Sequence, residues 1–204
     1  MQLKHRLNTV AAALAMAAIA APALAETSTF TNSADFLASL KGGHYTESFD
    51  GLAELPAGAA GFSGNGFSYT VSAPGNLYAS GEFLSTSLPD LAITINFTGG
   101  PINAVGGNFY AVNLSDAFQA VALTLTLSDG TVTSFTPGSV LDSFRGFSSN
   151  LAISSLTLSG PGTSLYATLD NLTVGSVSAV PEPGTWALMG LGLAGLGLAR
   201  RRKA

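Results

Sequence analysis

The fold is decided by Val121-Ala122-Leu123-Thr124-Leu125-Thr126-Leu127, followed by Ser128-Asp129-Gly130 and Thr131-Val132-Thr133-Ser134-Phe135. Apolar residues alternate with threonine in the first segment, a period of two that is typical of a strand with one buried face. The Ser-Asp-Gly segment predicts a tight turn, because aspartate and glycine accept the backbone angles that a short hairpin requires. The whole stretch therefore predicts two antiparallel strands.

The same alternation recurs on both sides of this hairpin. It is found in residues 93–97, 151–158 and 165–174, and Gly-Pro or Gly-Gly pairs at residues 99–101, 106–107 and 160–162 divide the segments. Many short strands separated by turns indicate an all-β antiparallel sandwich or barrel. Asn-x-Ser/Thr triplets at Asn96, Asn113 and Asn171 are interpreted as polar strand faces.

One short helix is expected before the strands. Thr31 or Asn32 can cap its start, Phe36, Leu37 and Leu40 give it an apolar face, and the Lys-Gly-Gly at residues 41–43 ends it. No second helix of this kind is predicted in the middle of the chain.

Residues 1–25 have the layout of a signal peptide. A basic start with Lys4 and Arg6 precedes an apolar run, and Ala23 and Ala25 are small residues at the two positions that signal peptidase reads. We expect cleavage after Ala25, so that the exported protein begins at Glu26.

Residues 181–204 form a second, three-part pattern. Pro181-Glu182-Pro183 is followed by an uncharged stretch, predicted to be a transmembrane helix at about residues 185–199, and then by Arg200-Arg201-Arg202-Lys203. The basic end stays cytoplasmic by the positive-inside rule, which places the preceding domain outside. Gly190, Gly192 and Gly195 match a dinucleotide motif, but no strand precedes them and no acidic residue follows, so the nucleotide function is excluded.

This tail resembles the PEP-CTERM sorting signal of Gram-negative bacteria that make extracellular polysaccharide. The resemblance covers about 25 residues, with Pro181, Glu182, Pro183 and Arg200, Arg201 and Arg202 as its motif positions. It implies that an exosortase recognises the tail after the chain has been held transiently in the inner membrane. The expected destination is the cell surface or the extracellular matrix, and an ordinary tail anchor is the alternative.

The middle of the chain resembles the jelly-roll sandwiches of PEP-CTERM ectodomains and carbohydrate-binding modules. Residues 47–52 and 166–175 carry this looser resemblance. We therefore expect a jelly-roll-like ectodomain at residues 26–174 and a short tether at residues 175–180. In such modules the first and last strands often hold a structural calcium, which would make Glu47, Asp50 and Asp170 its ligands; no other cofactor is expected.

Charge and composition exclude several function classes. Eleven carboxylates face only Lys41 and Arg145 between Glu26 and Asp170, a net charge of −9 in a chain of net charge −4. Nucleic acid is an improbable partner for such a surface, because phosphates need basic side chains. The absence of cysteine excludes disulfides and thiolate metal sites.

No catalytic set can be assembled from the sequence. His44 is the one histidine left after signal cleavage, and a serine triad requires a histidine as its base. We interpret His44 instead as an exposed residue at a loop or strand end. Glu47, Asp50, Glu54 and Glu82 are candidates for paired carboxylates, but no spacing selects a pair.

Three functions are compatible with these sequence features. The first is a non-catalytic surface or matrix protein, the second is a carbohydrate-binding module for extracellular polysaccharide, and the third is a secreted polysaccharide-active enzyme. Tyr69, Tyr78 and Tyr110 could line a sugar-binding face of the sandwich, or they could pack into its core.

Overall fold

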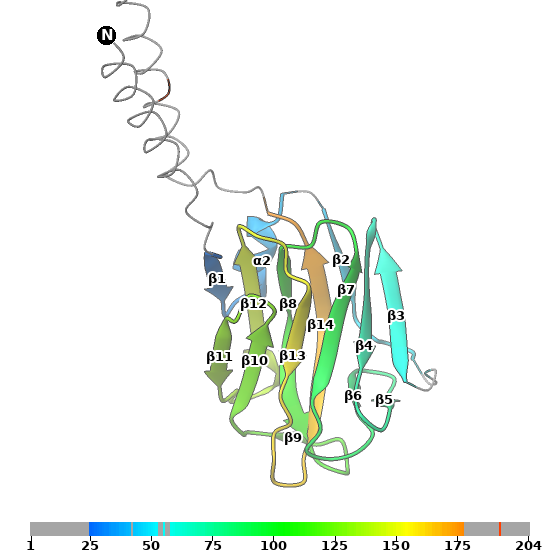
Figure 1. The fold of residues 1–204 in the computed structure, drawn as a ribbon. Coiled ribbons are helices and arrows are strands. Elements are labelled where there is room, and N and C mark those ends of the chain that lie inside the picture. Colours follow the sequence, from blue (N-terminus) through cyan, green and yellow to red (C-terminus); the bar gives the residue numbers. More distant parts are fainter. Residues whose placement is uncertain (1–24, 42, 53–54, 56–57, 178–191, 193–204) are drawn as a thin grey trace, which may run out of the picture.

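The structure is a computed structural model that describes residues 25–41, 43–52, 55, 58–177 and 192. It contains two antiparallel β-sheets, which confirms the predicted sandwich (Figure 1). The eight-stranded sheet has the order β1-β12-β8-β14-β6-β5, with β2 also paired to β14 and β9 to β8. The six-stranded sheet has the order β11-β10-β13-β7-β4-β3.

The strands are mostly short, and two longer ones form the centre of the eight-stranded sheet. The elements are β1 (Thr27–Phe30), α2 (Ser33–Ser39), β2 (His44–Glu47), β3 (Ala59–Gly64), β4 (Phe67–Ser72), β5 (Leu77–Ala79), β6 (Leu84–Thr86), β7 (Ile93–Gly99), β8 (Ala104–Val112), β9 (Phe118–Gln119), β10 (Leu123–Leu127), β11 (Val132–Phe135), the 3₁₀ helix η1 (Val140–Asp142), β12 (Phe144–Ser149), β13 (Ser155–Leu158) and β14 (Tyr166–Gly175).

The predicted hairpin is confirmed as β10 and β11. Leu123 pairs with Phe135 and Thr126 with Val132, and Gly130 takes a φ of 89° in the turn. The Asp129 side chain accepts a hydrogen bond from the Thr131 backbone N–H at 2.8 Å. Leucines 123, 125 and 127 are buried while the threonines between them are partly exposed, as the alternation predicts.

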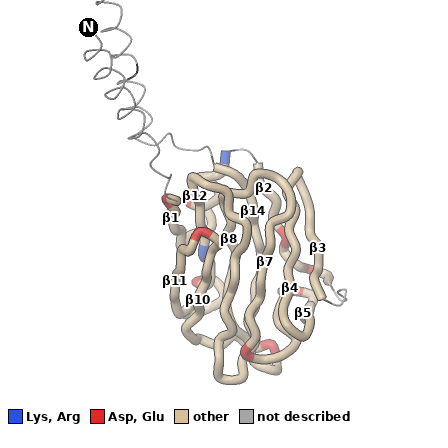
Figure 2. Tube along the Cα trace, viewed as in Figure 1, with Lys and Arg blue, Asp and Glu red and all other residues tan. Residues whose placement is uncertain are grey.

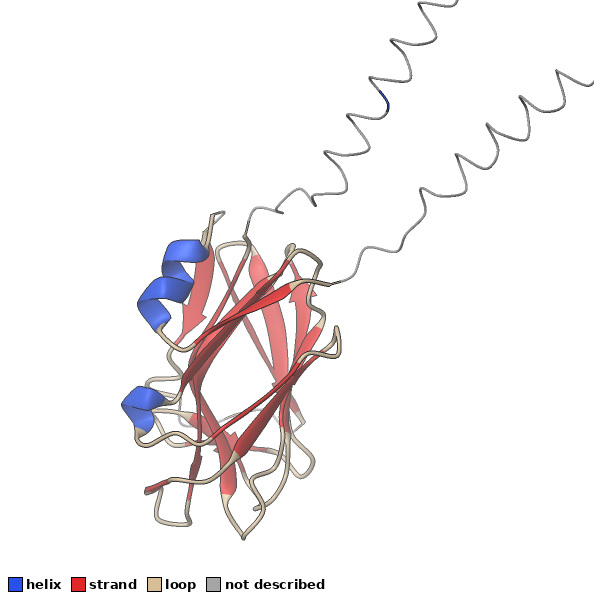
Figure 3. Cartoon of the chain, turned by 90° about the vertical axis from the view of Figure 1, so that its left-hand side faces the viewer, coloured by secondary structure: helices blue, strands red, loops and turns tan. Residues whose placement is uncertain are grey.

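The predicted helix is also confirmed, as α2. Its N-cap is Asn32, whose side-chain oxygen accepts from the backbone N–H groups of Ala34 and Asp35. The helix lies outside the eight-stranded sheet, on the same side as η1 (Figure 3). Phe36 is fully buried there and packs against the rings of Phe30 and Phe144.

Gly106 and Gly107 correct one part of the prediction. They were expected to mark a gap between strands, but they lie in the middle of β8. A Cβ on Gly106 would lie only 3.0 Å from Cε1 of Phe36 and 2.9 Å from Cζ of Phe144. Because glycine has no side chain, the rings of Phe36 and Phe144 can pack directly on the backbone of β8.

The main core fills the space between the two sheets. Ile95, Leu125 and Leu156 enter it from the six-stranded sheet, and Phe109 and Leu169 enter it from the eight-stranded sheet. Two smaller clusters lie on the outer face of the eight-stranded sheet. One is Phe36, Ala104 and Phe144 beneath α2; the other is Phe83, Tyr110 and Val112, with Phe118 and Tyr166 packed against it.

The C-terminal strand keeps contact with the domain beyond its predicted end. β14 includes Gly175, and Asn103 exchanges hydrogen bonds with Val177 at 2.8 and 3.2 Å. The backbone N–H of Lys41 also donates to the carbonyl of Ser176 at 3.0 Å. The expected tether at residues 175–180 thus begins with three residues that pack on the sandwich.

Candidate functional site

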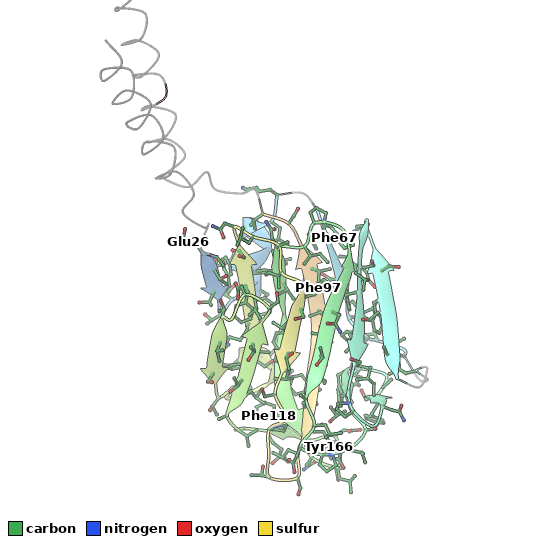
Figure 4. All side chains as sticks on the ribbon, in the orientation of Figure 1. Glu26, Phe67, Phe97, Phe118 and Tyr166 are labelled. Carbon is green, nitrogen blue, oxygen red and sulfur yellow. The ribbon has the colours of Figure 1, made fainter. Side chains whose placement is uncertain are left out.

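The two ends of the sandwich carry different features. At one end, which we call the basal end, the backbone of Asn103 joins two strands: its N–H donates to the Gly175 carbonyl, and its carbonyl accepts from the Ser149 N–H. The N–H of the next residue, Asn150, donates to the carbonyl of Glu26, which therefore lies at the same end. Tyr166 begins β14 at the other end, which we call the distal end (Figure 4). Ten strand residues separate the two ends, a length of about 30 Å.

A pocket of about 230 Å³ lies at the distal end. It is formed on the eight-stranded sheet, beside β5, where β6 and β8 end and β14 begins, and by the loop that follows β8. Its side chains combine aromatic, apolar and polar groups, chiefly those of Tyr78, Val112, Asn113, Leu114, Asp116 and Tyr166.

Tyr78 and Asp116 are joined across the pocket. The Tyr78 hydroxyl donates to Oδ2 of Asp116 at 2.9 Å, and 41% of the Tyr78 side chain is exposed. This hydrogen bond, with some burial and the carboxylate charge, raises the pKa of Tyr78 above its ordinary value. The neutral phenol therefore stays in place as a flat, partly apolar wall.

The loop after β8 is held by its own hydrogen bonds. Oδ1 of Asn113 accepts from the backbone N–H groups of Ser115 and Ala117, at 2.9 and 3.1 Å. The backbone N–H of Asp116 donates to the Asn113 carbonyl, and Asp116 has a φ of 57°. Because both donors fix the amide oxygen, the Asn113 Nδ2 group is oriented away from them as a donor.

The opposite wall is fixed in the same way. The Ser87 hydroxyl donates to the carbonyl of Gly75 or Asn76, each 3.0 Å away, and the Ser87 N–H also donates to Asn76. Thr86 contributes to this wall, but it follows Leu84 by two residues on a strand, which points its side chain toward the core. Its Oγ1, which has no hydrogen-bond partner within the described chain, is therefore assigned to the core.

The three predicted calcium ligands do not form one cluster, although Asp50 lies near enough to Asp170 for its charge to act on that carboxylate. Glu47 ends β2, where one carboxylate oxygen accepts from the Tyr45 hydroxyl and the other from the Phe49 N–H at 3.2 Å. Asp50 is exposed beyond Phe49. Over the described ranges, no group of three or more histidine or carboxylate side chains is close enough to hold a metal ion. The calcium site stays a prediction.

Asp170 lies at a bulge in β14. The register on β8 shifts between Asp170 and Thr173, and Asn171 has a φ of 51°. Asp170 accepts from the N–H and the side-chain amide of Asn171, at 2.6 and 2.7 Å. Burial, together with the charges of Asp50 and Glu82, outweighs these bonds and raises the pKa of Asp170 to about 6.

The three tyrosines proposed for a sugar-binding face lie in different places. Tyr69 is 1% exposed and belongs to the main core. Tyr110 is buried in the small cluster on the outer face of the eight-stranded sheet, and burial raises the pKa of its hydroxyl. Only Tyr78 lies beside the pocket, and Tyr166, which was not grouped with these three, joins it there.

His44 and the asparagines of the three Asn-x-Ser/Thr triplets lie in strands and in a turn. His44 is exposed at the first residue of β2, as expected. Asn96 and Asn171 lie at exposed strand positions as predicted, Asn171 at the bulge of β14, whereas Asn113 lies in a turn, so the strand-face interpretation is wrong for Asn113. Asn113 and Asp116 were not identified from the sequence as binding residues.

The two terminal signals fall almost wholly outside the described residues. This holds for Ala23, Pro181, Glu182 and Pro183, for Arg200, Arg201 and Arg202, and for nearly all of the predicted transmembrane helix at residues 185–199. Ala25 is described and exposed. Within the described part of the chain, no helix is long and apolar enough to cross a membrane.

Comparison with known protein families identified the C-terminal signal. Residues 179–203 match the model of the PEP-CTERM protein-sorting motif. The predicted resemblance is thus confirmed over nearly the same residues, and the motif implies exosortase processing during sorting toward the cell surface. Searches of curated proteins and of solved structures found no match.

Proposed function

We propose that this chain is an exported, non-catalytic protein of the cell surface or extracellular matrix, delivered by an exosortase acting on its PEP-CTERM tail. The single observation that carries the proposal is the sorting motif at residues 179–203, which begins two residues after Val177 packs against the sandwich. In this route, signal peptidase releases Glu26 as the new N-terminus, and the tail holds the protein briefly in the inner membrane.

The domain's architecture supports a role in display. Its last strand ends at the basal end, so a tail held in the membrane leaves the distal end facing outward. The outer threonine and serine side chains of the six-stranded sheet suit prolonged exposure to water without relying on charge. We further propose that the ectodomain has jelly-roll-like connectivity and passes through a transmembrane intermediate during its delivery.

The surroundings of Glu47 and His44, two of the candidate catalytic residues, support a non-catalytic role. Glu47 is engaged by Tyr45 and Phe49 within its own segment, and His44 is exposed at a strand end with no carboxylate bonded to it among the described residues. Paired acid and base groups close enough to act on one bond are the feature that a glycoside hydrolase needs.

The test changes the motif and follows the domain. Pro181→Ala combined with Glu182→Ala should leave the protein in the inner-membrane fraction, whereas the unchanged protein should reach the cell surface and be accessible to added protease. The matched control is Pro161→Ala with Glu82→Ala, a proline and a glutamate outside the motif. If the motif variant and the control are displayed equally well, sorting through the motif is wrong.

A second candidate, a carbohydrate-binding module, is favoured by one observation. The distal pocket places the rings of Tyr78 and Tyr166 beside polar side chains. Aromatic rings with neighbouring hydrogen-bonding groups suit a ligand that has both apolar C–H faces and hydroxyls.

A further inference from the structure

The distal pocket has the features of a binding site for a small, uncharged ligand. Its position, size, chemistry and charge are independent observations, and each one narrows the class of ligand. We propose that the distal pocket binds one uncharged sugar ring, either a terminal residue or a side branch of a polysaccharide. This inference deepens the proposed function, on which it rests for the pocket's exposure outside the cell.

The size of the pocket limits the ligand to a single ring. A volume of about 230 Å³ lies below the range of about 300–1,000 Å³ that is usual for drug-sized ligands. The pocket is also bounded by two loops, which fits the end of a chain better than an extended stretch of several sugars.

The wall residues are complementary to a pyranose ring, because they combine apolar surface with hydrogen-bonding groups. Tyr78 is partly exposed, Tyr166 is half-buried, and Leu114 is 85% exposed, so apolar area is available for the C–H face of a ring. Asp116 uses only Oδ2 for Tyr78, which leaves Oδ1 as an acceptor, and Nδ2 of Asn113 makes no hydrogen bond within the described chain. Together they could accept from one sugar hydroxyl and donate to another.

The charge around the pocket selects against anionic ligands. Asp116 is its charged lining residue, and no lysine, arginine or histidine is among the residues that line it. Of the basic residues in the described chain, Lys41 is hydrogen-bonded to Ser176 through its backbone and Arg145 lies over the ring of Phe135, so neither lines the pocket. Figure 2 shows acidic and no lysine or arginine residues at the distal end of the sandwich. A uronate or a phosphorylated sugar would bring a second negative charge toward Asp116 without a compensating cation.

The pocket is largely pre-formed, which reduces the cost of binding. Asn113 is fixed by two backbone donors, and Ser87 fixes the opposite wall through Gly75 and Asn76. Side chains that are already held in place lose little conformational freedom when a ligand arrives. A weak but selective interaction with a single sugar ring is expected.

Saturation-transfer NMR on the full-length chain in a detergent without a sugar head group tests the proposal. The probes are the methyl glycosides of glucose, galactose, mannose and N-acetylglucosamine, with methyl glucuronide and choline as charged comparisons. We expect transfer to at least one neutral glycoside, and at least tenfold weaker binding of the glucuronide. No transfer to any neutral glycoside, stronger binding of the glucuronide, or binding of choline alone would each overturn the proposal.

Variants locate the binding site. Tyr78→Ala and Asp116→Ala should each weaken the best glycoside about tenfold or more, a change in binding free energy of about 1.4 kcal/mol. Tyr78→Phe keeps the ring and should cost less than Tyr78→Ala. The control is Leu141→Ala, which removes a 95% exposed apolar side chain from η1, outside the pocket, and should bind normally. Unchanged binding by both pocket variants, with unchanged melting temperatures, would show that the sugar binds elsewhere and overturn the assignment.

Surface display of the same variants separates the two proposals. Tyr78→Ala should reach the surface as the unchanged protein does, because its sorting motif is intact. A protein that is displayed but binds no neutral glycoside would contradict the sugar site alone. A protein that binds the glycoside but is never displayed would contradict the proposed delivery and leave the site standing.

Discussion

The two sheets of the sandwich differ in how they use their outer faces. In the six-stranded sheet, β10 and β13 alternate between buried leucine and partly exposed serine or threonine, so one face is core and the other meets solvent. In the eight-stranded sheet, β8 and β14 are buried on both faces over most of their length. The additional burial comes from α2 and η1, from the cluster around Tyr110, and from the walls of the distal pocket.

This difference indicates which sheet carries the specialised features. The six-stranded sheet follows the period of two over most of its length, with one register shift between β4 and β7, and its outer face is rich in serine and threonine. The bulge at Asp170, the glycines under α2 and the pocket beside Tyr78 all belong to the eight-stranded sheet. The six-stranded sheet closes the core, and the eight-stranded sheet carries the packed helix, the bulge at Asp170 and the pocket.

The largest expected effect comes from the outer face of the eight-stranded sheet. Phe36→Ala should lower the free energy of unfolding by about 3–5 kcal/mol, because the ring is fully buried between Phe30, Phe144 and the glycines of β8 and β12. The control is Thr126→Ala on the outer face of β10, which should change stability by less than about 0.5 kcal/mol. Urea unfolding followed by circular dichroism measures both, and similar losses for the two variants would remove the contrast between the sheets.

A smaller effect is expected from glycines at matched strand positions. In Gly146→Ala, the new Cβ would lie 2.8 Å from Cδ2 of Phe36, so we expect a loss of about 1–3 kcal/mol through overpacking. Gly61→Ala in β3 meets no atom within 4 Å and should be neutral or stabilising by up to about 1 kcal/mol. Thermal melting of the two variants gives the comparison; a Gly146 variant as stable as the unchanged protein would mean that α2 is not packed tightly on β12.

The smallest expected effect depends on pH and involves Asp170. Its folded-state pKa of about 6 lies above the ordinary value of 3.8, so the stability that the neutral acid gives is complete below about pH 4 and is lost as the pH rises through 6. Asp170→Asn should therefore be more stable than the unchanged protein at pH 7, by about 1 kcal/mol because Asp170 is only partly buried.

The difference between the two proteins should shrink as the pH falls toward 4, which melting temperatures at pH 4, 5, 6 and 7 would reveal. Asp129→Asn serves as the comparison, because hydrogen bonds from Thr27 and Thr131 outweigh the opposing effect of burial and lower the pKa of Asp129. Its change in stability should have the opposite sign. An Asp170 variant whose advantage grows at low pH would contradict the assignment.

The sequence predicted the regular parts of the fold well. Alternation identified β10, β11, β7 and most of β14, and the Asn32 cap with Phe36 identified α2, because each signal is local in the chain. β8 was missed, since it is buried on both faces and contains Gly106 and Gly107, which locally resemble a turn. Gly106 is required by the ring of Phe36, 70 residues earlier in the chain, and Gly107 faces Asp170 and Leu172 of β14, more than 60 residues later.

The candidate site was harder to predict for the same reason. Tyr78, Asp116 and Tyr166 come from β5, from the loop after β8 and from β14, so only the folded sheet brings them together. The turn-forming residues at 113–116 were a usable signal for a rigid loop, but nothing in them indicated a ligand. The sorting motif, by contrast, is continuous in sequence and was identified directly.

The intact mass of the protein recovered from the cell surface tests the central claim most directly. The account predicts the mass of a chain that begins at Glu26 and has lost the residues beyond the Pro-Glu-Pro segment, including Trp186 and the terminal arginines. A surface protein that retains residues 186–204 intact would contradict delivery through exosortase processing.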